Sequence, residues 1–292
     1  MNSKLIINLD EISSNTDVSI SKLVSWGIKH CEIRVINGKN ISYLTEKECL
    51  ELKFRLENAG LQPYLITSPI FKWNFCNGSR ISNLNKIDTF GVSPCLTYSE
   101  KKHVIENVIN NAKILNTKKI RIFSGTNCTL KEFLQSNELK NLISMYSDYY
   151  FLIENEKSCA LKTLSDFITC KNFIEQNNIK NLGFLLDIGN ISLCDKEFNI
   201  QDISNIKNYV QHIQLKNFQI KNNAVKFTSL EEGIIEYHYI LQEIKKIWLQ
   251  RNINIGIETD IWNSTLRYRS IKESVRYLKN YLNADCKIKL NT

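Results

Sequence analysis

The chain contains little glycine or proline and has no long apolar run. Only 10 Gly and 3 Pro occur among its 292 residues, which argues against collagen-like, linker-like and disordered classes. No stretch approaches the roughly 18 uninterrupted apolar residues that would span a bilayer. The short apolar run near the N-terminus carries Asn8 and Asp10 and lacks a small-residue cleavage site. We therefore expect a cytoplasmic protein that makes no membrane contact.

Paired cysteine motifs and clustered basic residues are also absent. The 9 Cys are scattered without a CxxC pair, and several, such as Cys31, Cys49, Cys170 and Cys194, lie beside apolar residues. This is typical of small buried hydrophobes in a reducing compartment rather than of disulfides or zinc ligands. The formal net charge is +8, but the lysines are spread along the chain. We expect no nucleic-acid partner, whereas an anionic small-molecule substrate is compatible with the charge.

Eight apolar runs alternate with segments of helical periodicity. The predicted strands are residues 4–9, 30–36, 62–70, 119–125, 149–155, 182–187, 209–216 and 253–258. Short runs rich in Ile, Phe, Val and Leu favour strands of a parallel sheet that is buried on both faces. The pattern predicts an α/β fold, a (β/α)8 TIM barrel that forms a single domain over residues 1–292. The chief rival, an open doubly wound sheet, usually has a Gly-rich turn after its first strand, and "NLDEISSNT" contains no Gly.

The segment "TEKECLELKFRLENAG" illustrates the predicted helices. Thr45 and Glu48 have the spacing of a capping box, and Gly60 is expected to end the helix. The residues expected to face the core are Leu50, Phe54 and Leu56.

Four polar residues stand at the ends of the last four predicted strands: Glu154, Asp187, Gln214 and Glu258. In a parallel barrel, the C-terminal ends of all strands meet at one rim. Three carboxylates that converge there repel one another unless a cation neutralises them. The pattern predicts a site for one divalent metal ion, although each residue could instead cap a helix, shape a turn or pair with a lysine.

Short motifs in the order of the strands resemble a known family. They are "CEIR", "SPIFKW", "RIFSG", "LIENE", "GFLLDIGN", "HIQLKN", "LEEGIIEYHYIL" and "IETD". Together they resemble the xylose isomerase-like TIM-barrel superfamily, in its sugar phosphate isomerase/epimerase branch. The resemblance implies one divalent ion held by Glu, Asp, His and Glu from strands five to eight. These positions are Glu154, Asp187, Gln214 and Glu258 in this chain.

The seventh strand departs from the family pattern His-x-His-x-Lys-Asp. His212 and Lys216 match it, but Gln214 replaces the metal-binding His and Asn217 replaces the Asp. A Gln carbonyl oxygen suits hard ions and is a poor zinc ligand, which favours Mn²⁺ or Mg²⁺ over Zn²⁺. Two alternatives stay open: His212 turns into the site, or the metal is lost and the pocket is retained.

The candidate substrate-binding residues are Glu156, Asn190, His212, Lys216, Arg34 and Trp73. His212 could equally be a core histidine, and Trp73 part of an aromatic core or lid with Phe71 and Phe75. The other histidines, His30, His103 and His238, are expected at the surface. The expected partner is a polyhydroxylated or anionic small molecule, and a homodimer is left open.

The resemblance implies proton transfer next to a carbonyl group, with Glu154 and Glu258 as the catalytic acid and base. It favours a metal-assisted isomerase or epimerase that acts on a sugar or a related hydroxy-ketone. The alternative is a metal-free or metal-altered relative that acts as a lyase, a dehydratase or a small-molecule-binding protein in a biosynthetic pathway. A DNA-repair endonuclease of this fold needs three zinc ions and further histidines, and the third and fourth strands contain none.

Overall fold

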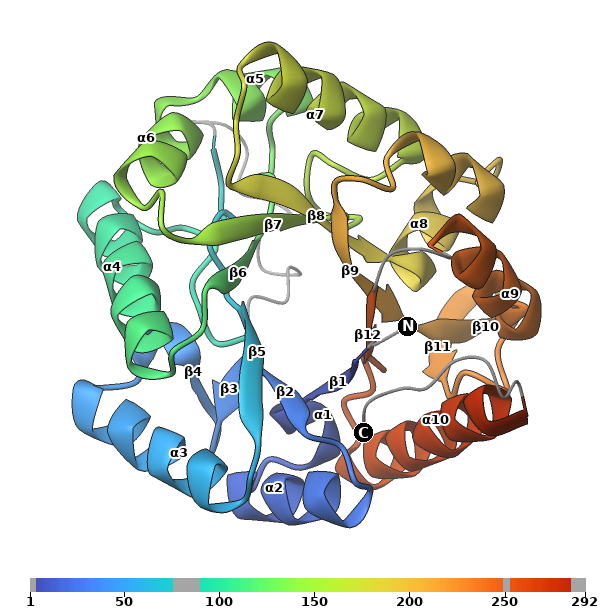
Figure 1. Ribbon diagram of the computed structural model, residues 1–292. Coiled ribbons are helices and arrows are strands. Elements are labelled where there is room, and N and C mark those ends of the chain that lie inside the picture. The colour runs from blue at the N-terminus through green and yellow to red at the C-terminus, as the bar shows by residue number, and fades with distance from the viewer. Residues whose placement is uncertain (1–3, 76–89, 249–252, 285–292) are drawn as a thin grey trace.

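A closed barrel of eight parallel strands forms the centre of the molecule, and helices surround it (Figure 1). The computed structural model describes residues 4–75, 90–248 and 253–284, and every structural statement below concerns these residues. The strands follow one another around the barrel in the order β1, β2, β5, β6, β7, β8, β9 and β12, and β12 closes on β1. This is the predicted (β/α)8 TIM barrel, and the closed order rules out the open sheet. That the whole of residues 1–292 forms one domain stays a prediction.

Each barrel strand lies within one of the eight predicted runs. Their bounds are β1 (Leu5–Asn8), β2 (His30–Ile33), β5 (Gln62–Thr67), β6 (Lys119–Ile122), β7 (Tyr150–Glu154), β8 (Leu182–Asp187), β9 (Val210–Leu215) and β12 (Asn254–Ile257). Most end earlier than predicted because the chain turns into loops at the rim. Two antiparallel hairpins lie outside the barrel, β3 (Val35–Ile36) with β4 (Lys39–Asn40), and β10 (Asn217–Lys221) with β11 (Ala224–Thr228).

The helices pack around the outside of the barrel (Figure 1). Their bounds are α1 (Leu9–Ile12), α2 (Thr16–Ser25), α3 (Glu46–Asn58), α4 (Tyr98–Ile114), α5 (Leu130–Gln135), α6 (Asn137–Met145), α7 (Leu164–Gln176), α8 (Ile188–Cys194), α9 (Tyr237–Ile247) and α10 (Ser264–Ala284), with short 3-10 helices at Ile41–Tyr43 and Ile200–Asn205. Within the part of the chain that the structure describes, none of them is both long and apolar enough to cross a membrane.

Helix α3 begins as predicted but turns a different face to the core. Thr45 and Glu48 form the expected capping box. The predicted inward positions are wrong for two residues, since Leu50 is 48% and Phe54 is 65% exposed. The buried residues are Cys49, Leu52 and Leu56, which are spaced by three and four positions and so share one helical face.

One histidine prediction is also wrong. His103 and His238 are exposed, as expected, but His30 is buried at the start of β2. Burial is the main cause that lowers the pKa of His30, to about 4. Of the four cysteines that were expected to be buried, Cys31, Cys49 and Cys170 are buried free thiols, whereas Cys194 is partly exposed.

The inside of the barrel has an apolar layer directly beneath its C-terminal rim. Leu65, Leu152 and Leu185 pack together there, with Tyr64 and Tyr150 beside them. Alternate residues of a strand face the same side. Leu152 therefore lies below Glu154 on β7, and Leu185 lies below Asp187 on β8. This layer forms a floor under the polar rim.

Candidate active site

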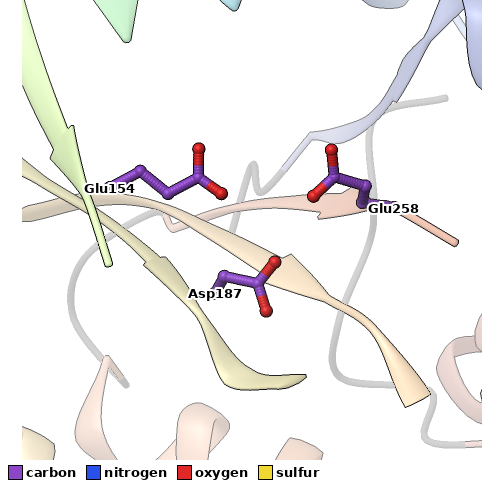
Figure 2. A group of neighbouring side chains, drawn as sticks. All are labelled: Glu154, Asp187 and Glu258. Atoms are coloured by element: carbon purple, nitrogen blue, oxygen red, sulfur yellow. The ribbon is translucent and has the colours of Figure 1, made fainter. Parts of the chain in front are cut away.

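Three carboxylates converge at the C-terminal rim of the barrel. Glu154 ends β7, Asp187 ends β8 and Glu258 follows β12. Each offers one carboxylate oxygen such that the three oxygens lie within 4.8 Å of one another (Figure 2). All three side chains are almost completely buried. The predicted convergence of the strand ends therefore holds for these residues.

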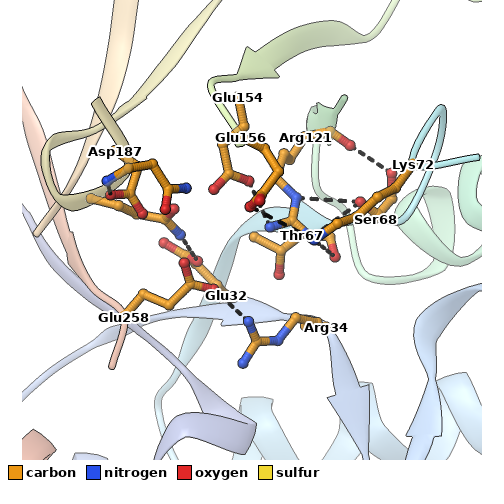
Figure 3. A network of polar contacts seen from close by, with 12 residues as sticks. Glu32, Arg34, Thr67, Ser68, Lys72, Arg121, Glu154, Glu156, Asp187 and Glu258 are labelled. Carbon is orange, nitrogen blue, oxygen red and sulfur yellow. Dashed lines mark hydrogen bonds and ion pairs between the residues drawn. The ribbon is translucent and has the colours of Figure 1, made fainter. Parts of the chain in front are cut away.

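Two arginines from nearby strands contact the glutamates (Figure 3), Arg121 on β6 beside β7, and Arg34 after β2. Arg121 Nη1 lies 2.8 Å from Glu154 Oε2, and its guanidinium also donates to the backbone oxygens of Thr67 and Ser68. Arg34 Nη1 lies 2.5 Å from Glu258 Oε1. Both guanidinium groups are buried, and each holds its glutamate in place through a charge-assisted hydrogen bond.

Lys216 inserts its ammonium group between three carboxylates. Its Nζ lies 3.1 Å from Asp187 Oδ2, 2.9 Å from Glu258 Oε2 and 2.7 Å from Asp260 Oδ2. Gly189 makes room for this side chain, since a Cβ there would lie 2.7 Å from both Lys216 Cβ and Lys216 O. The chain therefore supplies an internal cation to its own acidic cluster.

The two glutamates sit in opposite electrostatic environments. Burial raises the pKa of Glu154 to about 8, and the nearby charge of Arg121 opposes that rise only in part. Burial acts on Glu258 in the same sense, but Lys216 and Arg34 outweigh it and hold its pKa well below the ordinary range. Burial also raises the pKa of Asp187, to about 7. One glutamate therefore favours the protonated form near neutral pH and the other favours the ionised form.

Gln214 lies beside Asp187 in the strand register, with Gly256 on its other side. Its Nε2 donates to Glu32 Oε2 over 3.2 Å. Its Oε1 is buried and accepts no hydrogen bond among the described residues. An unsatisfied buried carbonyl oxygen is costly unless a ligand reaches it.

These oxygens fit a hard divalent cation. Three carboxylates and a free amide oxygen form an all-oxygen set, which suits Mg²⁺ or Mn²⁺ better than Zn²⁺. Glu154, Asp187, Gln214 and Glu258 are the residues that would hold it. The ammonium of Lys216 would compete with that ion for Asp187 and Glu258.

A pocket of about 730 Å³ opens above the carboxylates. Of the predicted substrate-binding residues, Glu156, Asn190 and Lys216 line it together with Glu154 and Glu258. Arg34 lines a neighbouring pocket of about 280 Å³, and Asp260 lines both pockets.

The other two predicted substrate-binding residues lie away from this pocket. His212 is fully buried deeper in the barrel, where its Nε2 lies 2.8 Å from Glu32 Oε1. Trp73 packs edge-on against Phe71, with ring centroids 5.7 Å apart, and does not line the pocket. The structure favours packing roles for both side chains, and their contact with a substrate stays a prediction.

Several charged residues of the site were missed by the sequence analysis. Arg121, Glu32 and Asp260 make contacts with the predicted site residues. A signal for the first two was present, since each is a charged residue inside an apolar run of a buried strand, "KIRI" and "HCEI". The outer face of a barrel strand packs against apolar helix faces, so a charged residue in such a run is expected to face the inside, where Arg121 and Glu32 meet polar partners.

Sequence and structure comparisons agree with this architecture. The sequence profile of the family described as "Xylose isomerase-like TIM barrel" matches residues 20–281. The chain belongs to this family. No curated protein matches this xylose isomerase-like chain in sequence.

Solved structures with the same fold include enzymes of different chemistry. The probable 3-DHS dehydratase AsbF of Bacillus anthracis, described as involved in petrobactin synthesis, is 15% identical, with a TM-score of 0.69 over 95% of this chain and 99% of that chain. An L-ribulose 3-epimerase is 13% identical, with a TM-score of 0.67 over 97% and 95%. A xylose isomerase-like protein of Mycobacterium smegmatis in complex with magnesium is 11% identical, with a TM-score of 0.61 over 97% and 100%. At these identities the likeness establishes the fold alone.

Proposed function

We propose that this protein is an isomerase or epimerase of a small hydroxy-ketone, such as a sugar, and that it moves a proton on the carbon next to the carbonyl group. Glu154 and Glu258 are the two proton carriers. The observation that carries the proposal is their placement at the end of β7 and directly after β12, with both residues lining one pocket. Two carriers on different sides of a bound substrate can remove a proton at one position and return it at another.

The environments of the two glutamates support this assignment. A proton-transfer pair needs one member protonated and the other ionised at the start of each turnover. In the protein without a bound metal ion, burial raises the pKa of Glu154 to about 8, so its carboxyl favours the protonated form that an acid needs. The pKa of Glu258 is held low by Lys216 and Arg34, which makes it the base.

A hard divalent cation fits the same oxygens. When bound, such an ion polarises a carbonyl oxygen and so acidifies the neighbouring carbon. The protein's own side chains would bind the substrate and exclude water. Lys216 would hold a substrate oxygen, Asn190 would hydrogen-bond a hydroxyl group, and the apolar layer below the rim would exclude water from the floor of the pocket.

The substrate class follows from the lining of the pocket. Its polar side chains carry both signs of charge, with Lys72 and Lys157 near Glu156 and Ser158. A polyhydroxylated molecule with several donors and acceptors matches this lining better than an apolar one. The comparison with L-ribulose 3-epimerase supports a ketose.

A dehydratase is the second candidate. The same acid and base could remove a proton from carbon and protonate a departing hydroxyl group, which eliminates water. Two observations support this candidate. The fold is similar to that of the probable 3-DHS dehydratase, and the raised pKa of the Glu154 carboxyl suits an acid that protonates a leaving hydroxyl group.

The test is a screen of ketoses and keto-glycosides with purified protein and Mn²⁺, followed by proton NMR. An epimer or an aldose–ketose pair supports the proposal, and an unsaturated product that has lost water supports the dehydratase. If no substrate in the panel exchanges a carbon-bound proton, the proposal fails.

A further inference from the structure

A buried carboxylate contacts Gln214, the amide among the residues that would hold the metal ion. Glu32 on β2 is 1% exposed. Its Oε2 accepts a hydrogen bond from Gln214 Nε2 at 3.2 Å, and its Oε1 lies 2.8 Å from His212 Nε2. Glu32 therefore joins β2 to β9 across the inside of the barrel.

His212 lies against the other carboxylate oxygen of Glu32, without a hydrogen bond of good geometry between the two side chains. Both side chains are buried, and a Cβ on Gly256 would lie 2.7 Å from His212 Nε2 and 2.9 Å from Glu32 Oε1. The absent Cβ thus leaves room for the pair on the β12 side. With Oε1 next to His212, the other oxygen of Glu32 is left for Gln214.

The contact with Glu32 determines which end of the Gln214 amide points away from it. An amide has a donating nitrogen and an accepting oxygen, and these ends can exchange places by rotation. An ionised carboxylate only accepts hydrogen bonds. Glu32 therefore selects the rotamer that presents the nitrogen of Gln214 to it, and Oε1 of Gln214 is left buried without a hydrogen-bond partner among the described residues.

The residue that carries the free oxygen is the strand neighbour of Asp187, a member of the carboxylate cluster. Gln214 and Asp187 are register partners on adjacent strands and share the inner face of the barrel. Asp187 Oδ2 also accepts no hydrogen bond among the described residues, although Lys216 Nζ approaches it at 3.1 Å. Two buried oxygens from neighbouring strands thus accept no hydrogen bond among the described residues at the same rim, and an ion pair reaches one of them.

We propose that Glu32 is a positioning residue that orients the amide of Gln214 so that its oxygen, not its nitrogen, faces a hard divalent cation at the carboxylate cluster. Glu32 itself does not touch the ion. The proposal rests on the metal-assisted form of the proposed function. It explains how a Gln can serve at this position, because an amide that turned its NH₂ group to the cation would repel it.

The test is a double-mutant cycle on metal affinity. Mn²⁺ binding is measured by calorimetry for the wild type, Glu32→Gln, Gln214→Leu and the double variant. Glu32→Gln keeps the shape of the side chain but offers both a donor and an acceptor, so either orientation of Gln214 is satisfied. We expect Glu32→Gln to weaken Mn²⁺ binding by about 10- to 100-fold, the usual effect of losing a residue that orients a metal ligand.

The Gln214→Leu variant separates two effects of Glu32 on metal affinity, the orientation of the Gln214 amide and the direct attraction between the Glu32 charge and the cation. The lost negative charge of Glu32 weakens cation binding through space whether or not Gln214 is present. If Glu32 acts through Gln214, its substitution should have much less effect in Gln214→Leu than in the wild type. Equal effects in both backgrounds would overturn the proposal, as would Mn²⁺ affinity that is unchanged by Gln214→Leu.

A conservative variant and a stability measurement complete the design. Glu32→Asp keeps an acceptor-only carboxylate and should retain Mn²⁺ affinity better than Glu32→Gln; the reverse order would contradict the proposal. Thermal unfolding of the metal-free variants shows whether each is folded. The readout is Mn²⁺ affinity, so this inference can hold even if no isomerase or epimerase activity is found. If Glu32 and Gln214 show no coupling in Mn²⁺ affinity but the enzyme still exchanges a substrate proton, the inference is wrong and the proposed function stands.

Discussion

The ammonium nitrogen of Lys216 lies 2.9 Å from Oε2 of Glu258, in the middle of the carboxylate cluster. Asp187 and Asp260 complete its contacts, and the side chain is 1% exposed. Lys216 therefore neutralises the acidic cluster, and its ammonium group would compete with a bound metal ion for the same carboxylates.

Lys216→Met should destabilise the metal-free protein and strengthen Mn²⁺ binding. Removing one partner of a buried ion pair leaves buried charge uncompensated, so the free energy of unfolding should fall by about 3 kcal/mol. The same change removes a positive charge that repels the ion. Denaturant unfolding in a chelator and calorimetry with Mn²⁺ measure the two effects. Lys72→Met is the matched control. Lys72 is also buried and lines the same pocket, but its ion pair is with Glu156, at 3.8 Å, and not with Glu154, Asp187 or Glu258. If Lys72→Met raised Mn²⁺ affinity as much as Lys216→Met, competition between Lys216 and the metal ion would be refuted.

Gln214→His should shift metal preference towards zinc. An imidazole nitrogen is a good ligand for Zn²⁺, whereas an amide oxygen is a poor one. Glu32 would accept the other ring N–H of the new histidine, in the place where it now accepts from Gln214 Nε2. Competition binding of Zn²⁺ against Mn²⁺ measures the shift. An unaltered ratio would show that position 214 does not contact the ion.

In the protein freed of divalent ions, Glu154 should make stability fall as pH rises. Its folded pKa is about 8, because burial raises it from the ordinary 4.5. Between those values the unfolded chain releases a proton that the folded chain keeps, so rising pH favours unfolding, and the effect levels off above pH 8. Glu154→Gln lacks this group, and its stability should improve relative to the wild type from about pH 5 to pH 8. Chemical unfolding at several pH values measures this, and parallel curves would contradict it.

Gly189→Ala should displace Lys216. The new Cβ would lie 2.7 Å from the Cβ and the backbone oxygen of Lys216, and backbone cannot give way cheaply. We expect a loss of about 1–3 kcal/mol in stability and weaker substrate binding. Gly60→Ala serves as the control, because its φ is +68° but no atom lies within 4 Å of the added Cβ. It should lower stability without changing ligand binding. Equal effects on binding in the two variants would argue against the packing role of Gly189.

Much of the fold could be predicted from the sequence because parallel buried strands leave a strong signal. Apolar runs with a polar last residue identify the strands and the rim, and Glu154, Asp187 and Glu258 meet there as expected. The prediction for α3 was wrong because Leu50 and Phe54, although apolar, lie on a different face of the helix. The buried face carries Cys49 and Leu56. Apolar character alone does not determine which face is buried.

The ion pairs of the site could not be predicted in the same way. Arg121 meets Glu154 across 33 positions, and Arg34 meets Glu258 across 224 positions. Such contacts depend on how the strands are staggered around the closed barrel, which a single sequence does not state. The consequence is specific. Burial raises the pKa of Glu154 and Arg121 only partly opposes this rise, whereas Lys216 and Arg34 outweigh the effect of burial on Glu258 and lower its pKa.

The most direct test of the account is solvent deuterium exchange into a substrate that the NMR screen identifies. The wild type with Mn²⁺ should place deuterium on the carbon next to the carbonyl group. Glu154→Gln and Glu258→Gln should each slow this by at least about 100-fold while remaining folded, because each removes a proton carrier. Glu273→Gln makes the same chemical change in a surface pair with Arg269 on α10 and should exchange at the wild-type rate. Undiminished exchange in both pocket variants would contradict the two-glutamate mechanism.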